Sequence, residues 1–244
     1  MSRPSAAAAA IVAFVLAILA VDQYVGAGGQ LALGAAMWLG LAAALRPLTP
    51  ERRLQAGIVV CIATCMEVVG SILWGVYAYR LGNLPLFVPP GHGLVYVAGL
   101  RLAESRVARE HGRAFIRAVA LAAIAWAALG LASVPRLDAS GALGTAVFLA
   151  CLAYGRAPTV YAGVFCVVAA VELTGTALGT WRWAEIVPGL ALPSGNPPSG
   201  AASGYVLFDV TAIAFAPALL TMVHRGGGPF PPPLTNALGA VLRR

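Results

Sequence analysis

Three carboxylic acids, Glu67, Glu172 and Asp209, lie inside long runs of apolar residues. An ionised side chain in such surroundings is costly unless it is paired or wetted, and acids found there usually face an interior and have a function. A carboxyl group that keeps its proton at neutral pH can act as a general acid, or can carry a proton during transport. We therefore predict that these three acids are the catalytic residues of the protein.

Small residues share a helix face with two of these acids. Gly70 and Ser71 follow Glu67 at three and four positions, and a glycine and a threonine follow Glu172 at the same spacings. Residues at these spacings are neighbours on a helix surface, and small residues let membrane helices approach closely. The two carboxyl groups are therefore expected to lie in helix interfaces. There they face each other across a functional site or, as the alternative, serve only as structural hydrogen-bonding groups.

The two glutamates belong to an internal repeat. The segment around Glu67 recurs 105 residues later around Glu172 and, after the loss of one residue, a tyrosine pair in the first copy matches a tryptophan pair in the second. The matching positions are Glu67, Gly70, Ser71, Leu73, Tyr77, Tyr79, Pro89, Pro90 and Tyr96, and then Glu172, Gly175, Thr176, Leu178, Trp181, Trp183, Pro197, Pro198 and Tyr205. We predict a parallel duplication, with repeat-like halves around 55–108 and 158–223 related by an axis along the membrane normal.

Aromatic and polar residues near the acids are expected to contact the substrate. The predicted substrate-binding residues are Tyr77, Tyr79, His92, Trp181, Trp183, Asn196 and Tyr205. Aromatic faces stabilise cations, carbocations included, although an aromatic belt at the membrane interface is the alternative reading of the tyrosine and tryptophan pairs. His92 could complete a metal site with the three acids, but no metal-binding spacing, phosphate loop or nucleotide fingerprint is present. We predict neither a metal nor a cofactor.

These side chains must be positioned by membrane helices. Of the 244 residues, 60% are hydrophobic and 10% are charged, whereas soluble domains carry about 25% charged residues. This composition excludes a soluble enzyme, and the absence of lysine excludes a retinal Schiff base. We predict an all-α, polytopic bundle of about eight transmembrane helices, each an apolar run of sufficient length. The predicted spans are 6–21, 28–45, 55–79, 91–108, 114–133, 139–155, 158–180 and 203–223.

The distribution of arginine predicts the orientation of the bundle. All 16 basic residues are arginines; with both termini in the cytoplasm, 13 lie inside and only Arg80, Arg136 and Arg182 lie outside. Because the arginines are spread over loops, the net charge of +7 indicates membrane topology rather than nucleic-acid binding. We expect a multi-pass protein of the bacterial inner membrane with an uncleaved first helix. Its bundle spans 1–225, and 226–244 form a Pro-rich cytoplasmic tail.

Two outer connections, 81–91 and 184–203, are rich in proline, glycine and apolar residues. Irregular apolar backbone at membrane depth is tolerated where it is buried in protein or lines a cavity. We predict that both connections fold as lids onto the outer mouth of the bundle. Loops that lie in the headgroup region are the alternative.

Both halves resemble the membrane carotenoid hydratases of bacteria and archaea. The resemblance rests on Glu67, Gly70, Gly75, Tyr77, Tyr79, Leu81, Gly82 and Pro89, and then on Trp181, Trp183, Pro188, Gly189 and Asn196. The resemblance covers 67–209. The Pro-Pro-Gly-His and Asn-Pro-Pro-Ser-Gly sequences depart from the family pattern, so the resemblance does not identify the substrate. It implies an enzyme that adds water to a double bond of a long isoprenoid without a redox cofactor.

In that chemistry Glu67 or Glu172 would protonate the alkene, and the aromatic pairs would hold the tertiary cation. Asp209 or the other glutamate would orient the attacking water. A small proton-coupled transporter or permease also fits a duplicated protein with acids near the membrane midplane, and a non-catalytic scaffold fits small-residue helix faces. The expected partner is a membrane lipid or an isoprenoid small molecule, with no nucleic acid and with the oligomeric state open.

Overall fold

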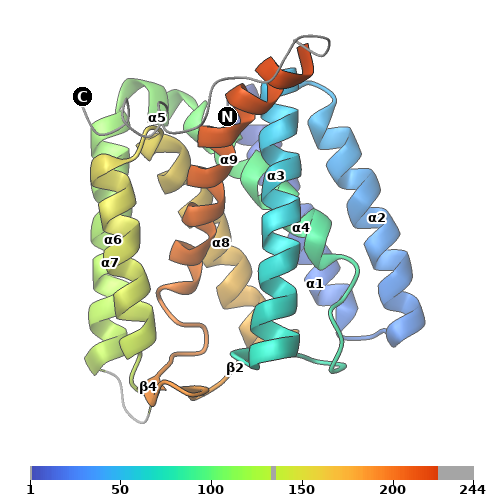
Figure 1. The fold of residues 1–244 in the computed structure, drawn as a ribbon, viewed down its shortest axis with the longest axis vertical. Coiled ribbons are helices and arrows are strands. Elements are labelled where there is room, and N and C mark those ends of the chain that lie inside the picture. The colour runs from blue at the N-terminus through green and yellow to red at the C-terminus, as the bar shows by residue number, and fades with distance from the viewer. Residues whose placement is uncertain (1, 133–135, 225–244) are drawn as a thin grey trace.

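The computed structural model describes residues 2–132 and 136–224, and these form a bundle of helices (Figure 1). The predicted tail 226–244 lies outside the described residues. Six helices in the described part are long and apolar enough to cross a membrane. They are α1 (Arg3–Asp22), α2 (Ala27–Leu45), α3 (Pro50–Glu67) continued by η1 (Val68–Trp74), α6 (Gly112–Ala132), α8 (Pro158–Leu178) and α9 (Ala201–His224). The protein is therefore a multi-pass helical membrane protein, as the sequence predicts.

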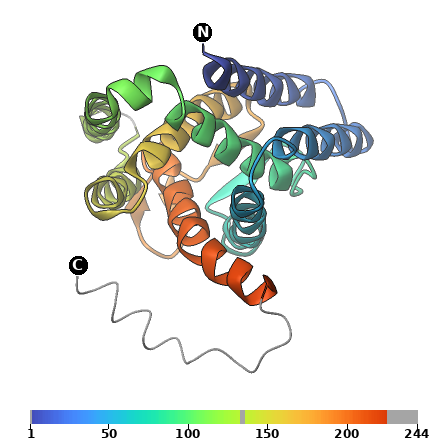
Figure 2. The ribbon, with the colours of Figure 1, turned by 90° about the horizontal axis from the view of Figure 1, so that it is seen from above.

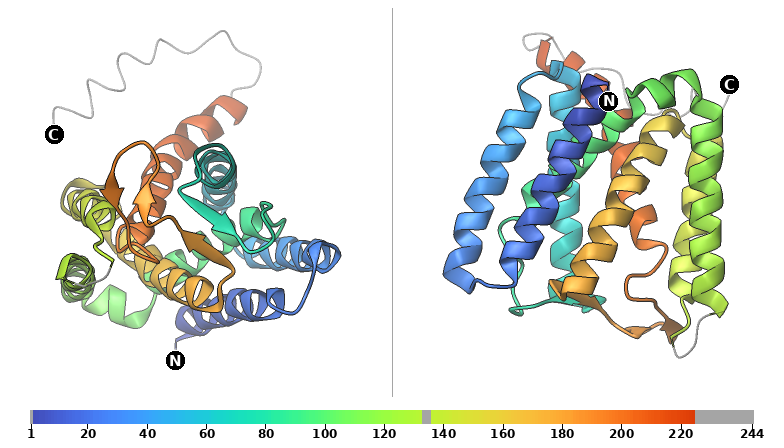
Figure 3. Two further views of the ribbon diagram at one scale, coloured as in Figure 1. Left: turned by 90° about the horizontal axis from the view of Figure 1, so that it is seen from below. Right: turned by 180° about the vertical axis from the view of Figure 1, so that it is seen from behind.

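Two further helices have 16 residues each. α7 (Ala139–Tyr154) runs between the two ends of the bundle, whereas α4 (Val88–Ala103) begins partway along the bundle and ends at the α5 end (Figures 1 and 3). α4 lies at the centre of the molecule (Figure 2), where it packs on α1, α2, α3 and α8. Every residue from His92 to Leu100 is buried. A Cβ at Gly99 would stand 2.3 Å from a methyl group of Val164 in α8. This glycine therefore allows the close helix contact that small residues provide in membranes.

The predicted span 55–79 is wrong at its outer end. The helix passes from α to π geometry in η1 and ends at Gly75, which has a φ of 77°. A glycine in the left-handed conformation often ends a helix, because glycine lacks the Cβ that makes a positive φ unfavourable for other residues. Tyr77–Tyr79 then form strand β1, consistent with the preference of alternating aromatic residues for extended backbone. The tyrosine pair thus lies on a strand and not on a helix.

Gly179 ends α8 in the same way, with a φ of 79°. Strand β2 (Trp181–Trp183) follows and pairs antiparallel with β1. The register places Tyr77 opposite Trp183, and Tyr79 opposite Trp181. Helices α3 and α8 are therefore joined at this end of the bundle by a two-stranded clasp.

The predicted span 91–108 is also wrong in its last turn. α4 ends at Ala103, and Ser105 begins the short helix α5 (Arg106–Glu110). The Ser105 hydroxyl accepts a hydrogen bond from the backbone N–H of Ala108 at 3.2 Å, the usual role of a helix N-cap. The other predicted spans agree with the observed helices to within three residues at each end.

The two outer connections lie at the strand end of the bundle, and contacts with neighbouring helices hold both in place (Figure 3). That they cover the outer mouth as lids stays a prediction. In the first connection, Asn83 donates a hydrogen bond to Gln30 of α2 at 2.9 Å, and Leu86 lies against Gly34 of the same helix. In the second, β3 (Ile186–Val187) pairs with β4 (Leu192–Pro193), and β4 lies beside α7.

Asp138, the N-cap of α7, holds the second connection in place. Its buried carboxylate accepts hydrogen bonds from the backbone N–H groups of Gly141, Gly195 and Ser199 and from the Ser199 hydroxyl, at 2.7 to 3.0 Å. Nearby, Arg136 donates to four backbone carbonyl groups on either side of the β3–β4 hairpin. These two side chains therefore replace the water that the polar backbone of this connection would otherwise need.

The opposite end of the bundle carries α5, and there Glu104 receives hydrogen bonds from Arg52 and Arg101. Burial raises the pKa of Glu104, but these hydrogen bonds lower it more, so the pKa lies below its ordinary value of 4.5. A lowered pKa means that the carboxylate stabilises the fold above pH 4.5 and that this stability is lost as the pH falls through the lower, folded-state value.

We expect Glu104→Gln to lower the free energy of unfolding at pH 7 by about 1 kcal/mol. The difference from wild type should shrink as the pH is lowered below 4.5. Thermal unfolding in detergent over a pH series measures this. Glu110→Gln, which removes an exposed ion pair with Arg106 at the same end, serves as the control with a smaller effect. Equal stability of Glu104→Gln and wild type at pH 7 would contradict the prediction.

Candidate functional site

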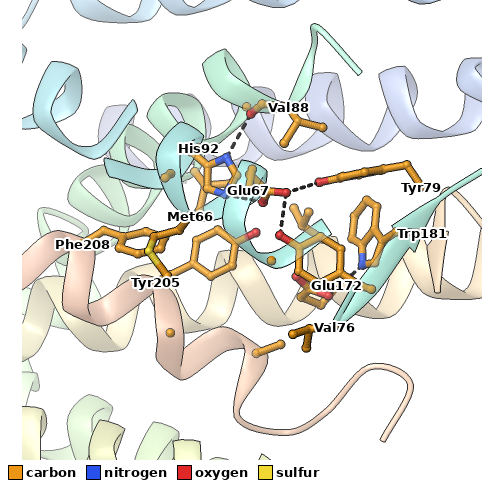
Figure 4. Close-up of a pocket in the computed structure, with 18 of the residues that line it drawn as sticks. Met66, Glu67, Val76, Tyr79, Val88, His92, Glu172, Trp181, Tyr205 and Phe208 are labelled. Carbon is orange, nitrogen blue, oxygen red and sulfur yellow. Dashed lines mark hydrogen bonds and ion pairs between the residues drawn. The ribbon is translucent and has the colours of Figure 1, made fainter. Parts of the chain in front are cut away.

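A cavity of about 220 Å³ lies at the strand end of the central helices, and Figure 4 shows its polar groups. Its walls come mainly from α3, η1, α4, α8, α9 and the two clasp strands, and most of them are apolar. Both Glu67 and Glu172 line this cavity. The structure therefore brings together the two acids that the sequence predicts to face each other.

Glu67 is 7% exposed and has three partners. One carboxylate oxygen, Oε2, accepts hydrogen bonds from the hydroxyl groups of Tyr77 at 2.7 Å and Tyr79 at 2.6 Å. Burial, and after it the charge of Glu67, raises the pKa of both tyrosines. Their hydroxyl groups therefore keep their protons and act as hydrogen-bond donors to the glutamate.

The other oxygen of Glu67, Oε1, lies 3.3 Å from Nε2 of His92. The second ring nitrogen, Nδ1, lies 3.0 Å from the carbonyl oxygen of Val88. A carbonyl oxygen can only accept, so we assign a hydrogen to Nδ1. The contact between Nε2 and Oε1 then needs one proton, which belongs either to the carboxyl group or to the imidazole. Glu67 and His92 thus form a pair that can hold a transferable proton in an apolar cavity.

Glu172 is 3% exposed, and its partners are two indoles and one phenol. Its Oε2 accepts hydrogen bonds from Nε1 of Trp181 at 3.0 Å and of Trp183 at 3.2 Å. An indole N–H can only donate, so this oxygen is fixed as an acceptor. The hydroxyl of Tyr205, from α9, also interacts with Glu172, and its ring stacks on His92 with a centroid distance of 4.9 Å.

Glycines make room for these aromatic donors. A Cβ at Gly70 would stand 3.0 Å from the Tyr77 ring, and a Cβ at Gly175 would stand 2.0 Å from the Trp181 ring. One turn after each glutamate, the hydroxyl groups of Ser71 and Thr176 donate to the glutamate's own carbonyl at 2.7 Å. The two glycines therefore leave space for the aromatic donors, whereas the hydroxyl groups of Ser71 and Thr176 bond within their own helices.

Two predicted site residues lie elsewhere. Asp209 is buried, but it does not line the cavity, and its Oδ2 has no hydrogen-bond partner in the described structure. It lies one turn beyond Tyr205 on α9. Asn196 also lies outside the cavity, where its side-chain oxygen accepts a hydrogen bond from the backbone N–H of Trp183 at 3.0 Å. Asn196 therefore positions strand β2 and does not touch the cavity contents.

The structure also places residues at the cavity that the sequence analysis did not identify. Phe208 lies against the rings of His92 and Tyr205, three positions after Tyr205 and so on the same helix face. Met66 and Trp74 line the cavity although they are about half exposed on the outer surface of α3 and η1. The helical spacing could have indicated Phe208, but no motif marks the other two.

Within residues 2–132 and 136–224, no group of three or more His, Cys, Asp and Glu side chains is arranged to hold a metal ion. The fold and the site thus define a multi-pass membrane protein with a buried, aromatic-lined cavity in which a carboxyl group contacts an imidazole. Comparison with protein-family models, with curated proteins and with solved structures gave no match.

Proposed function

We propose that the protein is an intramembrane enzyme that acts on an apolar isoprenoid or lipid by carboxylic-acid catalysis, with hydration as the reaction type. The contact between Glu67 and His92 inside an apolar cavity carries this proposal. A general acid needs a proton held within reach of the reacting atoms, and the pair provides one. The apolar walls favour a hydrocarbon substrate over the polar solute of a permease.

The proposed reaction begins with transfer of a proton from the Glu67 carboxyl group to an alkene carbon. The π electrons form the new C–H bond, which leaves a carboxylate and a tertiary carbocation. The ring faces of Tyr77 and Trp183, whose centroids lie 4.7 Å apart, can stabilise the cation. Water then adds to the cation, and the proton that it releases returns to Glu67 or passes to Glu172. The product is a tertiary alcohol, and no redox change occurs.

We also propose that the chain crosses the bacterial inner membrane eight times with both termini in the cytoplasm, so that α4 and α7 are short spans. At the strand end, the three arginines all have partners: Arg80 contacts Asp22, Arg182 contacts Glu185, and Arg136 contacts backbone carbonyls. Most of the other described arginines lie at the α5 end, in agreement with cytoplasmic loops that carry the excess of positive charge.

A parallel duplication is part of the same proposal. In the first half the N–H of Val76 bonds to the carbonyl of Gly70, and in the second the N–H of Thr180 bonds to that of Gly175, both at 2.8 Å. The hydrogen bond in the first half spans one residue more than the bond in the second half, and the π-helix η1 accommodates this extra residue. In the pairing of β1 with β2, Tyr77 lies opposite Trp183 and Tyr79 lies opposite Trp181. A two-fold axis through the middle of this pair would exchange the matching residues of the two halves, so the pairing supports the duplication.

The test uses a host that makes linear isoprenoids with trisubstituted double bonds. Lipid extracts of cells with the wild-type protein and with an empty vector are compared by mass spectrometry. A product heavier by one water, formed only with the protein, is the expected result. An unchanged lipid profile, with folded protein present in the membrane, would overturn the proposal.

A further inference from the structure

A second hollow lies at the α5 end of the bundle, and no residue of the clasp strands lines it. It has a volume of about 430 Å³ and is formed by α3, the α4–α5 region and the start of α8. Alanines at 103, 108 and 157 line it, and their small side chains leave the space open. The hollow shares no lining residue with the cavity that holds Glu67.

Three arginines line this hollow: Arg52, Arg109 and Arg156. They come from α3, α5 and the connection between α7 and α8, so the fold gathers them from distant parts of the sequence. Glu104 is the one acid among the described lining residues, and it is already bonded to Arg52 and to Arg101. The hollow therefore carries a net positive charge.

Arg109 and Arg156 have no ion-pair or side-chain hydrogen-bond partner among the described residues. By contrast, the neighbouring Arg106 pairs with Glu110 at 2.8 Å. Unengaged guanidinium groups beside an open space can bind an anion in the two-point geometry that suits phosphate. The first turn of α8, which begins at Pro158 and includes Thr159, also lines the hollow and adds the positive end of a long helix dipole.

We propose that this hollow binds the phosphate group of an anionic phospholipid of the cytoplasmic leaflet. The helix ends that form it lie at headgroup level if the apolar helices span the bilayer, and basic pockets between membrane helices on the cytoplasmic side recognise such headgroups. The site does not depend on the catalytic proposal, but its place in the cytoplasmic leaflet rests on the orientation proposed above. A free phosphate ester offers the same chemistry, and the experiment separates the two sources.

The full-length protein is placed in phosphatidylcholine nanodiscs that contain increasing fractions of phosphatidylglycerol, and binding is followed by thermal unfolding. The double variant Arg109→Gln/Arg156→Gln is compared with Arg113→Gln/Arg117→Gln, which removes the same charge from exposed positions on α6 that do not line the hollow. Each arginine near the surface contributes about 1 kcal/mol. The first double variant should therefore bind phosphatidylglycerol roughly 30-fold more weakly, and the second should bind nearly as wild type does.

If both double variants bind phosphatidylglycerol equally weakly, the binding depends only on general surface charge and the proposal is overturned. The proposal is also overturned if neither variant binds phosphatidylglycerol more weakly than wild type. Unfolding in pure phosphatidylcholine shows whether the variants fold normally. In a second arm, inorganic phosphate is added to the protein in neutral detergent. Stabilisation by phosphate, together with none by phosphatidylglycerol, would overturn the lipid as the source and assign the site to a soluble phosphate ester.

Discussion

Glu67→Gln is expected to reduce conversion of the lipid substrate by roughly 10²–10⁴-fold, the usual contribution of a positioned general acid. Glutamine has nearly the same shape, and its oxygen can still accept the hydrogen bonds that Tyr77 and Tyr79 donate. Its amide cannot release a proton to an alkene, however, and the carboxyl group that contacts His92 is lost. The variant therefore keeps the cavity and loses the chemistry.

Product formation per unit of folded protein in membranes measures this effect. Glu185→Gln is the matched control, because this acid lies at the same end of the bundle but its side chain is 74% exposed and it pairs only loosely with Arg182, at 3.9 Å. The control should retain full activity. Thermal unfolding of both variants shows whether the fold is intact. Full activity in a folded Glu67→Gln protein would show that the protein is an enzyme but would remove Glu67 from the mechanism.

Asp138→Ala is expected to lower the free energy of unfolding by about 3–5 kcal/mol, which would be the largest stability effect among the substitutions considered. The carboxylate is 2% exposed and accepts hydrogen bonds from three backbone N–H groups and one hydroxyl. Each buried donor left without an acceptor costs about 1–3 kcal/mol. The loss should detach the β3–β4 hairpin from α7 before the helices separate.

Denaturation in mixed detergent micelles gives the free energy, and proteolysis of the connection reports local detachment. Ser199→Ala is the graded control, since it removes a single donor and leaves the carboxylate with three. Its cost should be about 1 kcal/mol. Equal stability of Asp138→Ala and Ser199→Ala would contradict the role assigned to Asp138.

The sequence was sufficient to predict the helical membrane fold, because apolar runs of helix length are a simple physical signal. It did not predict the strands β1 and β2. Tyr77 and Trp181 continue apolar runs and resemble the interfacial ends of helices, and only the positive φ of Gly75 and Gly179 ends those helices. A glycine in an apolar run gives no sign of whether it will adopt that conformation.

The candidate site was predicted in part. The placement of Glu67 and Glu172 followed from their shared spacing to small residues, which is a local property of a helix. The contact of His92 with Glu67 depends on how the α4 start meets α3, which local spacing cannot show. Asp209 is at least as buried as the two glutamates, but it does not line the cavity, although the preceding residue, Phe208, does. The position of an acid within an apolar run therefore does not show whether its carboxyl group lines a cavity or is packed among other side chains.

The unequal partners of the two carboxyl groups have a consequence for their roles. Both acids line one cavity, but Glu67 contacts phenols and an imidazole, whereas Glu172 contacts indoles and Tyr205. The two acids are therefore not interchangeable, although they occupy equivalent positions in the sequence repeat. We expect the same substitution at Glu67 and at Glu172 to have different effects on any reaction in the cavity.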